Sequence, residues 1–329
     1  MEEGLDLVDQ AASFGKPYPT IIFTGGDPLK RPDIFELLQH AGKVGIGFAL
    51  SPAITDTLSG EILSRIKSLG TSSISVSLDG AFADTHDLIR GRARTFEKTV
   101  DVLRKAKEIG LQVQVNTAIM KRNFAELPKM FHLIRSLGVR TWELFFLVKV
   151  GRGNSVEDLS PEEAESVCNF LYDVSRYDCV VRCVEAPFIR RVAKQRAELG
   201  DYWGSNAIYS KLKEELAMLE GNPARDARSS LSLRGTLDGD GIIFVAYDGS
   251  IHPGGLVPLN LGNVRSGNLV DIYRNNELLR SIRERKLNGA CGECGFRDSC
   301  GGSRARALAY FGDPRGSDPA CINVSRFPR

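Results

Sequence analysis

The first half of the chain alternates short apolar runs with longer segments in which apolar residues recur every three or four positions. Runs rich in Val, Ile, Thr and Phe predict β-strands, and the longer spacing predicts amphipathic helices. We expect strands at 20–24, 45–50, 73–78, 112–118 and 141–148, with helices between them at 33–43, 58–69, 95–109 and 124–137. A repeated strand–helix unit predicts parallel strands and an α/β fold.

Polar and glycine-rich residues follow each predicted strand. They are Gly25-Gly26-Asp27-Pro28, Ser51-Pro52, Asp79-Gly80, Asn116-Thr117 and Gly151-Arg152-Gly153. The pattern fits either an open doubly wound sheet or a closed or partly closed barrel, and in both the chemistry lies at the carboxyl ends of the strands. We therefore expect these strand ends to converge on one site.

Beyond the five strands the chain changes character twice. Residues 160–219 read as mostly helical, with a possible strand near 178–185. From Thr236 onward the sequence is rich in glycine and turns, and short strands are expected at 241–246 and 251–252. We predict three segments: a partial barrel at 1–155, a helical connector at 156–235 and a small domain at 236–329.

Composition narrows the class of protein. The 43 Lys and Arg residues nearly balance the 41 Asp and Glu residues, which leaves no electrostatic footprint for nucleic acid. The longest apolar stretches fall far short of the roughly 20 residues that span a bilayer, and the acidic start lacks the basic and apolar regions of a signal peptide. We expect a cytoplasmic protein with no nucleic-acid partner and no membrane span.

Four of the seven cysteines gather near the C-terminus: Cys291, Cys294, Cys300 and Cys321. A Cys-x-x-Cys turn places two thiolates on one side of a loop, and the other two cysteines bring further soft ligands. Four thiolates suit zinc or an iron–sulfur cluster, and the neighbouring glycines, which let the backbone approach a bulky group, favour the cluster. The remaining three cysteines, at 168, 179 and 183, lack ligand-like spacing and are expected to be small buried hydrophobic residues.

Two further motifs lie at strand ends. Paired glycines at Gly25 and Gly26 permit close approach of a ligand's polar head, and Pro28 fixes the turn around Asp27. Ser77, Asp79 and Arg90 offer a hydroxyl, a carboxylate and a guanidinium within one strand-to-helix segment. Such groups suit ribose hydroxyls and a carboxylate, although a plain turn at Asp79 and a solvated Arg90 would also explain them.

Together these segments resemble the radical S-adenosylmethionine (SAM) superfamily with a SPASM-type C-terminal domain. The resemblance is carried, over nearly the whole chain, by TGGDPLKRPD, SVSLDG, THDLIRG, QVNTAIMKRN, FFLVKVGRG, CGECGFRDSCGGSRARA and DPAC. The most similar subgroup is the tetrapyrrole-related one, which contains alternative haem synthases and haem d1 maturases. The resemblance implies a partial (β/α)6 barrel followed by a small C-terminal iron–sulfur domain.

The same resemblance implies roles for individual residues. Gly25, Gly26, Asp27 and Pro28 would hold the amino group of SAM, Ser77 and Asp79 would face its ribose, Arg90 would bind its carboxylate, and Asn116 would line the pocket. An auxiliary [4Fe-4S] cluster would be bound by the four C-terminal cysteines.

Two departures from the family pattern matter. The family's SAM-cleaving cluster is held by a CxxxCxxC loop after the first strand, and these 329 residues contain no such motif. We expect it, with its second [4Fe-4S] cluster and the first barrel strand, upstream of Met1, because of truncation or a misassigned start codon. Full SPASM domains also carry further cysteines, around 253–262 and at Arg304, where this chain has none.

The expected function is that of a radical SAM enzyme in haem-related biosynthesis. The 5'-deoxyadenosyl radical would abstract hydrogen from a tetrapyrrole, with a ferredoxin or flavodoxin as the electron donor. A peptide maturase is the alternative enzyme. Two alternatives come from other classes of protein: a non-catalytic iron–sulfur or SAM-binding fragment, and a zinc-stapled binding protein.

Overall fold

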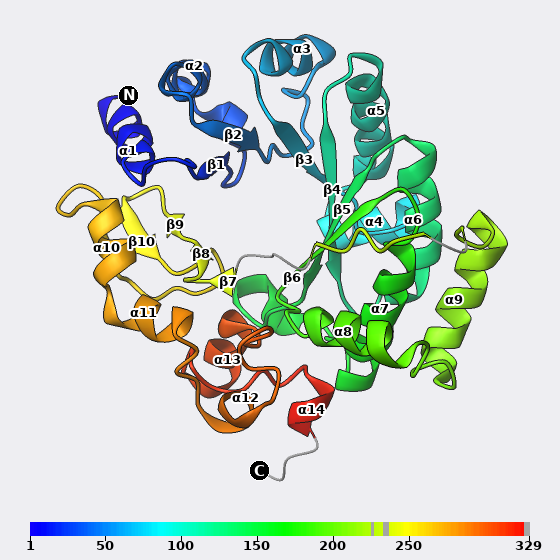
Figure 1. The fold of residues 1–329 in the computed structure, drawn as a ribbon. Coiled ribbons are helices and arrows are strands. Elements are labelled where there is room, and N and C mark those ends of the chain that lie inside the picture. The colour runs from blue at the N-terminus through cyan, green and yellow to red at the C-terminus, as the bar shows by residue number, and fades with distance from the viewer. Residues whose placement is uncertain (225–226, 233–236, 326–329) are drawn as a thin grey trace.

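The computed structural model describes residues 1–224, 227–232 and 237–325. Its centre is a sheet of six parallel strands that follow one another in chain order and curl into a half-barrel (Figure 1). The strands are β1 Thr20–Phe23, β2 Gly47–Leu50, β3 Ser73–Ser77, β4 Val113–Ile119, β5 Thr141–Phe146 and β6 Val180–Val184. The five expected strands and the α/β partial-barrel fold are thus confirmed, and the possible strand near 178–185 is the sixth.

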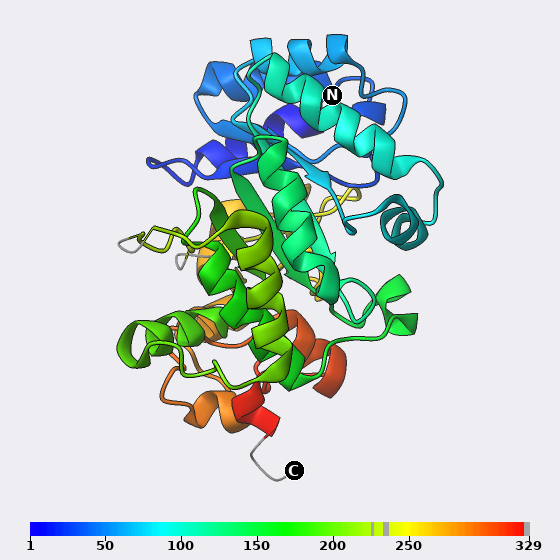
Figure 2. The same ribbon diagram turned by 90° about the vertical axis from the view of Figure 1, so that its right-hand side faces the viewer.

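Helices connect the strands and cover the outer, convex face of the sheet (Figures 1 and 2). They are α2 Ile34–Val44, α3 Gly60–Ser68, α4 Ala83–Arg90, α5 Thr95–Glu108, α6 Leu127–Ser136 and α7 Pro161–Val174, with α8 Ile189–Leu199 and α9 Ala207–Glu220 after β6. Single 3₁₀ turns are η1 Pro28–Lys30, η2 Phe124–Glu126 and η3 Gly151–Ser155. Helix α4 differs from the expectation, because the sequence pattern predicts a strand-to-helix loop, carrying Arg90, over these residues.

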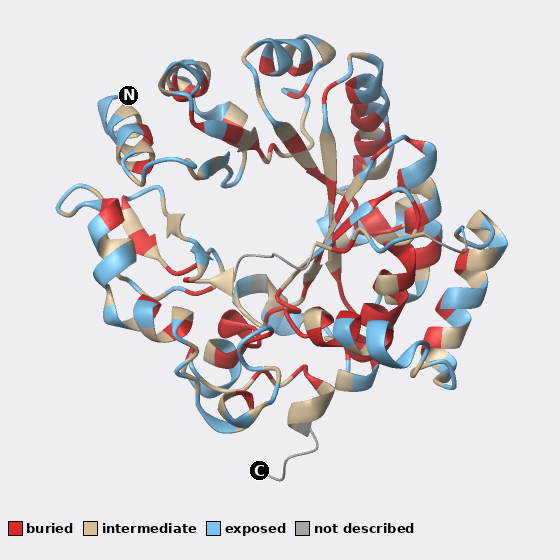
Figure 3. Cartoon of the chain, in the orientation of Figure 1, coloured by how far each residue is buried: buried red, intermediate tan, exposed pale blue. Residues whose placement is uncertain are grey.

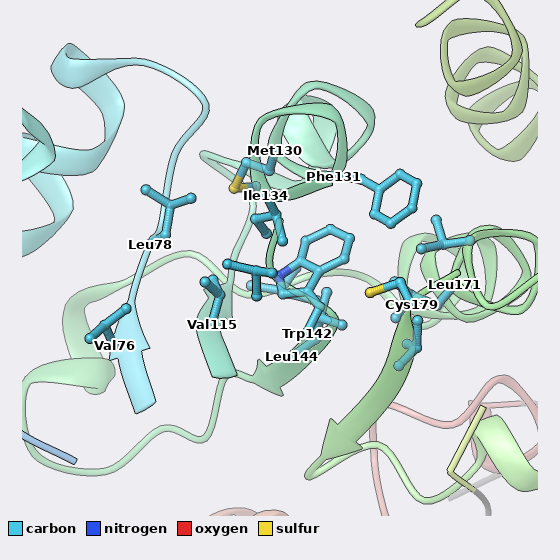
Figure 4. Close-up of a cluster of buried hydrophobic side chains, with 14 of the residues drawn as sticks. Val76, Leu78, Val115, Met130, Phe131, Ile134, Trp142, Leu144, Leu171 and Cys179 are labelled. Carbon is cyan, nitrogen blue, oxygen red and sulfur yellow. The ribbon is translucent and has the colours of Figure 1, made fainter. Parts of the chain in front are cut away.

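The strands keep their apolar residues on the convex face and their polar residues on the concave face. In β3, β4 and β5 buried positions alternate with half-buried ones, as Figure 3 shows. Val76, Val115 and Trp142 therefore pack outward against the helices (Figure 4). Period-two alternation in a half-buried strand produces this division, and it leaves the concave face free for polar side chains.

Trp142 lies at the middle of the core between the sheet and its helices. Its ring stacks on Phe131 with 6.0 Å between centroids, and its Nε1 donates a hydrogen bond to Oγ1 of Thr117 at 2.8 Å. Burying an aromatic side chain of this size contributes roughly 4–6 kcal/mol before opposing terms. The indole thus joins β5 to β4 and α6.

Residues 237–325 form what we call the C-terminal module. It contains the short strands β7 Leu237–Asp238, β8 Gly241–Ile242, β9 Phe244–Val245, β10 Ser250–His252 and β11 Gly262–Asn263, then α10 Leu269–Asn275, α11 Glu277–Arg283, α12 Gly289–Glu293, α13 Arg304–Phe311 and α14 Ile322–Ser325. β9 and β10 pair antiparallel, as the turn-rich sequence predicts. The predicted boundary between 235 and 236 lies outside the described residues, so the three-segment division stays a prediction.

The module is joined to both sides of the half-barrel. Arg306 Nη1 donates to the carbonyl oxygen of Glu185 at 2.8 Å and its Nη2 to that of Leu147 at 3.1 Å, directly after β6 and β5. On the other side Gln10, in helix α1 Glu2–Ala12, accepts a hydrogen bond from the N–H of Leu269 at 3.0 Å. The module therefore bridges the carboxyl ends of the last strands and the helix that precedes β1 (Figure 1).

No helix within the described ranges combines the length and apolarity that a bilayer crossing requires.

Candidate functional site

A row of polar side chains crosses the concave face of the sheet, from the end of β3 to the middle of β6. Ser77 of β3 stands beside Asn116 of β4, Asn116 beside Glu143 of β5, and Glu143 beside Arg182 of β6. Gln114 holds this row together, since its Nε2 donates to Oδ1 of Asn116 at 2.8 Å and to Oε2 of Glu143 at 2.7 Å. Burial raises the pKa of Glu143, although the Arg182 charge opposes that rise. The row offers hydroxyl, amide and carboxyl groups to a polar ligand.

Asp79 lies at the end of β3 and is only 1% exposed. Its Oδ1 accepts a hydrogen bond from the N–H of Ala118 at 2.7 Å, and its Oδ2 forms an ion pair with Nε of Arg90 at 2.7 Å. Burial raises the pKa of this carboxyl, while Arg90 and Ala118 act against the rise. Both carboxylate oxygens of Asp79 thus bind other residues of the chain and join α4 to β4. A contact between Asp79 and a ligand stays a prediction.

His86, on α4, is a buried partner that the sequence did not single out. Its Nδ1 accepts a hydrogen bond from the N–H of Asp79 at 3.0 Å, so the neutral ring carries its proton on Nε2. Burial, with the nearby Arg90 charge, lowers the pKa of His86 to about 4. The imidazole therefore fixes the start of the loop between β3 and α4.

The Gly25–Pro28 turn follows β1 at the same edge of the sheet. Gly25 has a φ of +130°, and a Cβ added at Gly25 or Gly26 would meet nothing within 4 Å. Asp27 caps η1 by accepting from the N–H of Leu29 at 3.2 Å, and its Oδ2 accepts from Oγ1 of Thr55 at 3.3 Å. The two glycines thus present open backbone at a strand end, on a turn anchored to the loop after β2.

The structure brings the predicted site residues into two groups at one edge of the sheet. Gly25, Gly26, Asp27 and Pro28 follow β1 on a turn that Asp27 ties to Thr55 after β2. In the second group Ser77 ends β3 beside Asn116 in the middle of β4, and Asp79 follows β3 and pairs with Arg90 at the end of α4. Between the groups, no direct hydrogen bond joins these residues in the described part of the chain.

The four C-terminal cysteines line one cavity of about 310 Å³. Cys291 lies in α12, Cys294 ends it, Cys300 precedes α13 and Cys321 precedes α14, so three short segments contribute the four cysteines to the same cavity lining. Cys291, Cys300 and Cys321 are each no more than 9% exposed. All four cysteines thus line the same cavity, and their joint binding of one metal group stays a prediction.

A backbone N–H points at each of the four sulfur atoms. Asp318 N lies 3.3 Å from Sγ of Cys291 and Phe296 N lies 3.4 Å from Sγ of Cys294. The N–H groups of Gly302 and Asn323 do the same for Cys300 and Cys321. Hydrogen bonds from backbone N–H groups stabilise thiolates and tune the groups that they bind.

Burial dominates the proton chemistry of these thiols. It raises the pKa of Cys300 to about 12 and that of Cys321 to about 11, and it raises the pKa of Cys291 as well. Thiols bind metals as thiolates, so occupation of the cavity by a metal group must release protons.

The cavity has the shape of a cradle for a bulky group. Gly302 has a φ of +63°, and a Cβ there would lie 2.9 Å from Sγ of Cys291 and 2.7 Å from Nη2 of Arg304. Only glycine fits that position without displacing a sulfur. Four sulfur donors, three of them in buried cysteines, around a volume of this size fit a multi-atom iron–sulfur group.

The other three cysteines do not line this cavity. Cys168 and Cys179 are buried and Cys183 is half-buried, and burial raises the pKa of all three thiols. The expectation of small, buried residues is confirmed for two of them, and Cys183 stays partly accessible.

Comparison with known proteins adds an independent line of evidence. A model of the radical SAM superfamily matches residues 1–134. An AdoMet-dependent heme synthase from Methanosarcina barkeri is 34% identical over 98% of this chain and 86% of its own length. An Fe-coproporphyrin III synthase from the same organism is 31% identical over 97% of this chain and 79% of its own length.

The fold has solved counterparts as well. The structure of native anSMEcpe with bound AdoMet and a Kp18Cys peptide superposes with a TM-score of 0.67 over 98% of this chain and 86% of that one, at 15% identity. At that identity the likeness concerns the fold, which is a curled parallel sheet followed by a further C-terminal region. Taken with the strand-end motifs and the matched segment, these relatives show that the chain belongs to the radical SAM superfamily.

Proposed function

We propose that the protein is a radical SAM enzyme that modifies a tetrapyrrole, such as an iron porphyrin, in haem-related biosynthesis. The observation that carries the proposal is the 34% identity to an AdoMet-dependent heme synthase along almost the whole chain. That identity spans both the strand-end site on the half-barrel and the four-cysteine cavity. When bound, SAM and the clusters would supply a 5'-deoxyadenosyl radical and the electrons that form it.

In this proposal the SAM molecule lies along the carboxyl ends of β1 to β4. The open backbone at Gly25 and Gly26 would receive its amino group, with Asp27 and Pro28 shaping that turn. Arg90, which is 36% exposed at its side chain, would share its guanidinium between Asp79 and the SAM carboxylate. Ser77 and Asn116 would face the nucleoside from the concave side.

Removing one strand-end contact tests this placement. We expect Ser77→Ala and Asn116→Ala each to weaken SAM binding about three- to tenfold, the effect of one lost hydrogen bond. Thr141→Ala is the matched control, because Thr141 lies on the same concave face at the other end of its strand. Equilibrium dialysis with labelled SAM measures the affinities, and equal losses in all three variants would contradict the placement.

We propose further that the cavity of the C-terminal module holds an auxiliary [4Fe-4S] cluster on Cys291, Cys294, Cys300 and Cys321. Its volume, the four N–H groups aimed at the sulfurs and the glycine at position 302 support a bulky group over a single ion. Anaerobic reconstitution followed by iron, sulfide and zinc analysis tests this. Four irons and four sulfides per chain are expected, whereas a zinc-filled, colourless protein would overturn the assignment.

The chemistry of SAM cleavage needs a separate test, because the 329 residues contain no CxxxCxxC. We expect this chain, reconstituted with SAM and a reductant, to bind one cluster and to release no 5'-deoxyadenosine. A longer reading frame with an in-frame CxxxCxxC upstream of the Met1 codon is expected to bind two clusters and release it. Sequencing that upstream DNA is the quickest check.

The substrate class is tested by direct binding. Iron coproporphyrin III, added to the reconstituted chain, is expected to give a saturable change in its visible spectrum at one equivalent per chain. A chain that binds no iron porphyrin but binds a peptide would favour the peptide maturase instead. We propose a ferredoxin or flavodoxin as the electron donor and the cytoplasm, where thiols stay reduced, as the compartment.

A further inference from the structure

Arg191 and Arg304 are buried arginines near the four cysteines, and neither has a place in the proposed SAM site. Arg191, on α8, lines the cavity together with the four cysteines and is 3% exposed. Its Nη1 and Nη2 donate to the two carboxylate oxygens of Glu165 at 2.8 and 2.5 Å. Its Nε, also buried, meets no hydrogen-bond acceptor among the described residues.

Arg304, the first residue of α13, approaches the cavity near Cys291. It is 1% exposed, and three of its hydrogen bonds go to backbone carbonyl oxygens, those of Gly302 at 3.1 Å and of Pro314 and Gly316 at 2.8 Å. Its Nη2 finds no acceptor, and no carboxylate in the described ranges forms an ion pair with it. Arg304 is thus a buried cation whose hydrogen bonds go only to neutral groups.

The distance from Arg304 to the nearest cysteine sulfur is bounded by Gly302. A Cβ built on Gly302 would lie 2.7 Å from Nη2 of Arg304 and 2.9 Å from Sγ of Cys291, so these two atoms are less than about 6 Å apart. Arg191 lies on the Cys321 side, where its charge counteracts the effect of burial on the pKa of that thiol. The two guanidinium groups therefore approach the cavity near different cysteines.

Neither arrangement is favourable for the protein alone. A buried charge without an ion-pair partner and a buried N–H without an acceptor both destabilise the folded chain. A [4Fe-4S] group on four thiolates has a net double negative charge when oxidised and a triple one when reduced, with sulfur atoms that accept hydrogen bonds. Such a group would supply both the missing charge and the missing acceptors.

We propose that Arg191 and Arg304 set the reduction potential of the auxiliary cluster, with Nε of Arg191 and Nη2 of Arg304 donating to its sulfur atoms. The inference rests on the proposed cluster and adds what tunes it. A fixed positive charge stabilises the more negative, reduced cluster more than the oxidised one, so both arginines make the midpoint potential more positive. Removing the charge shifts the midpoint in the negative direction.

The experiment is an EPR-monitored redox titration of the anaerobically reconstituted chain. Arg304→Met removes the charge without leaving a carboxylate unpaired, and Arg304→Lys retains the charge. Arg304→Met is expected to shift the midpoint in the negative direction, and Arg304→Lys is expected to keep it near the wild-type value. Identical midpoints for wild type and Arg304→Met would overturn the proposal for Arg304.

A second pair of variants tests Arg191 and provides the matched control. Arg191→Lys keeps a cation for Glu165 but removes the Nε donor, and Arg196→Lys makes the same change on the same helix at a buried arginine that pairs with Asp173 and does not line the cavity. Only Arg191→Lys is expected to shift the midpoint, and in the negative direction, because it removes a hydrogen-bond donor to the cluster. Equal shifts in the two lysine variants would show a structural effect and overturn the proposal for Arg191.

Failure of the underlying cluster assignment gives a different result. A wild-type chain that incorporates no iron and sulfide contradicts the proposed cluster, whereas a loaded chain with unchanged midpoints contradicts only the arginine assignment. If Arg304→Met does not fold or load, Arg304→Gln removes the same charge with a polar side chain and is expected to shift the midpoint in the negative direction; an unchanged midpoint in Arg304→Gln would overturn the proposal for Arg304.

Discussion

His86 and Asp79 form a buried pair whose titrations have opposite effects on stability. The neutral imidazole of His86 accepts a backbone hydrogen bond in the folded chain, and its pKa falls from 6.5 to about 4. Asp79 beside it has a raised pKa because its carboxyl is buried. Single residues with no access to solvent thus determine how the loop after β3 responds to acid.

The His86 titration predicts an acid-dependent loss of stability. A folded-state pKa below the unfolded value means that the unfolded chain binds the proton first, so the contribution of His86 is complete above about pH 6.5 and is lost as the pH falls toward 4. The loss amounts to at most about 3 kcal/mol. Denaturant unfolding of wild type and His86→Asn across this range measures it.

The difference between wild type and His86→Asn isolates the contribution of His86 to the free energy of unfolding. Asp79 titrates in both proteins and drops out of the difference, and an Asn at position 86 can still accept from the Asp79 N–H. A free energy of unfolding that falls equally in both proteins between pH 6.5 and 4 would contradict the prediction.

At the scale of elements, the short segments that carry the cysteines depend on one glycine. Gly302 combines a φ of +63° with a Cβ position only 2.9 Å from Sγ of Cys291. We expect Gly302→Ala to lower the iron and sulfide bound per chain severalfold, because the loop must move the sulfur to admit the methyl group. Metal analysis after reconstitution measures the loss.

The control for this substitution lies in the same loop. A Cβ on Gly295 would meet nothing within 4 Å, and its φ is not positive. Gly295→Ala should therefore bind the cluster as wild type does, and an equal loss in both variants would indicate general sensitivity of the loop.

Strands and helices were predictable where one periodicity dominates. β4 reads Val113-Gln114-Val115-Asn116, and that alternation places Asn116 on the polar face that the structure shows. Arg191 could not be singled out in the same way, because its segment Phe188–Gln195 is rich in basic residues, which are usually solvated on a helix. Only the packing of α8 against α7 and the cysteine loops reveals that Arg191 is buried.

Other parts of the site were hidden for a similar reason. In the sequence, Arg304 stands out only as a position where full SPASM domains carry a cysteine. No sequence pattern distinguishes a buried cation from an exposed one. His86 was read as part of a loop, because α4 is short and begins without a side-chain cap. Whether such residues are buried depends on contacts between distant parts of the chain, and the local sequence pattern holds no information about those contacts.

At the scale of the whole molecule, α1 and the C-terminal module hold each other in place. Gln10 donates to the carbonyl oxygen of Val264 at 3.4 Å and accepts from Leu269 N at 3.0 Å, while the rings of Phe14 and Tyr273 meet edge to face at 5.5 Å. Arg265 adds an exposed ion pair with Glu3, which contributes little. These contacts attach helix α1 to the C-terminal module.

Gln10→Ala tests this connection. Loss of two partly buried hydrogen bonds is expected to cost about 1–3 kcal/mol and to speed amide hydrogen exchange in residues 262–275, while β3 to β5 stay protected. Ser13→Ala is the control, because the Ser13 hydroxyl bonds only to Asp9 within the same helix region. Unchanged exchange in residues 262–275 would contradict the prediction.

The contact between Glu3 and Arg265 has a consequence for how the chain is made. The two residues are 262 positions apart, and a ribosome adds on the order of 5–20 residues per second. Helix α1 must therefore wait on the order of ten to fifty seconds for the partner that covers it, with the open edge of β1 beside it. A nascent chain stalled before residue 265 is expected to keep that end unprotected, where chaperones or other unpaired strands can reach it.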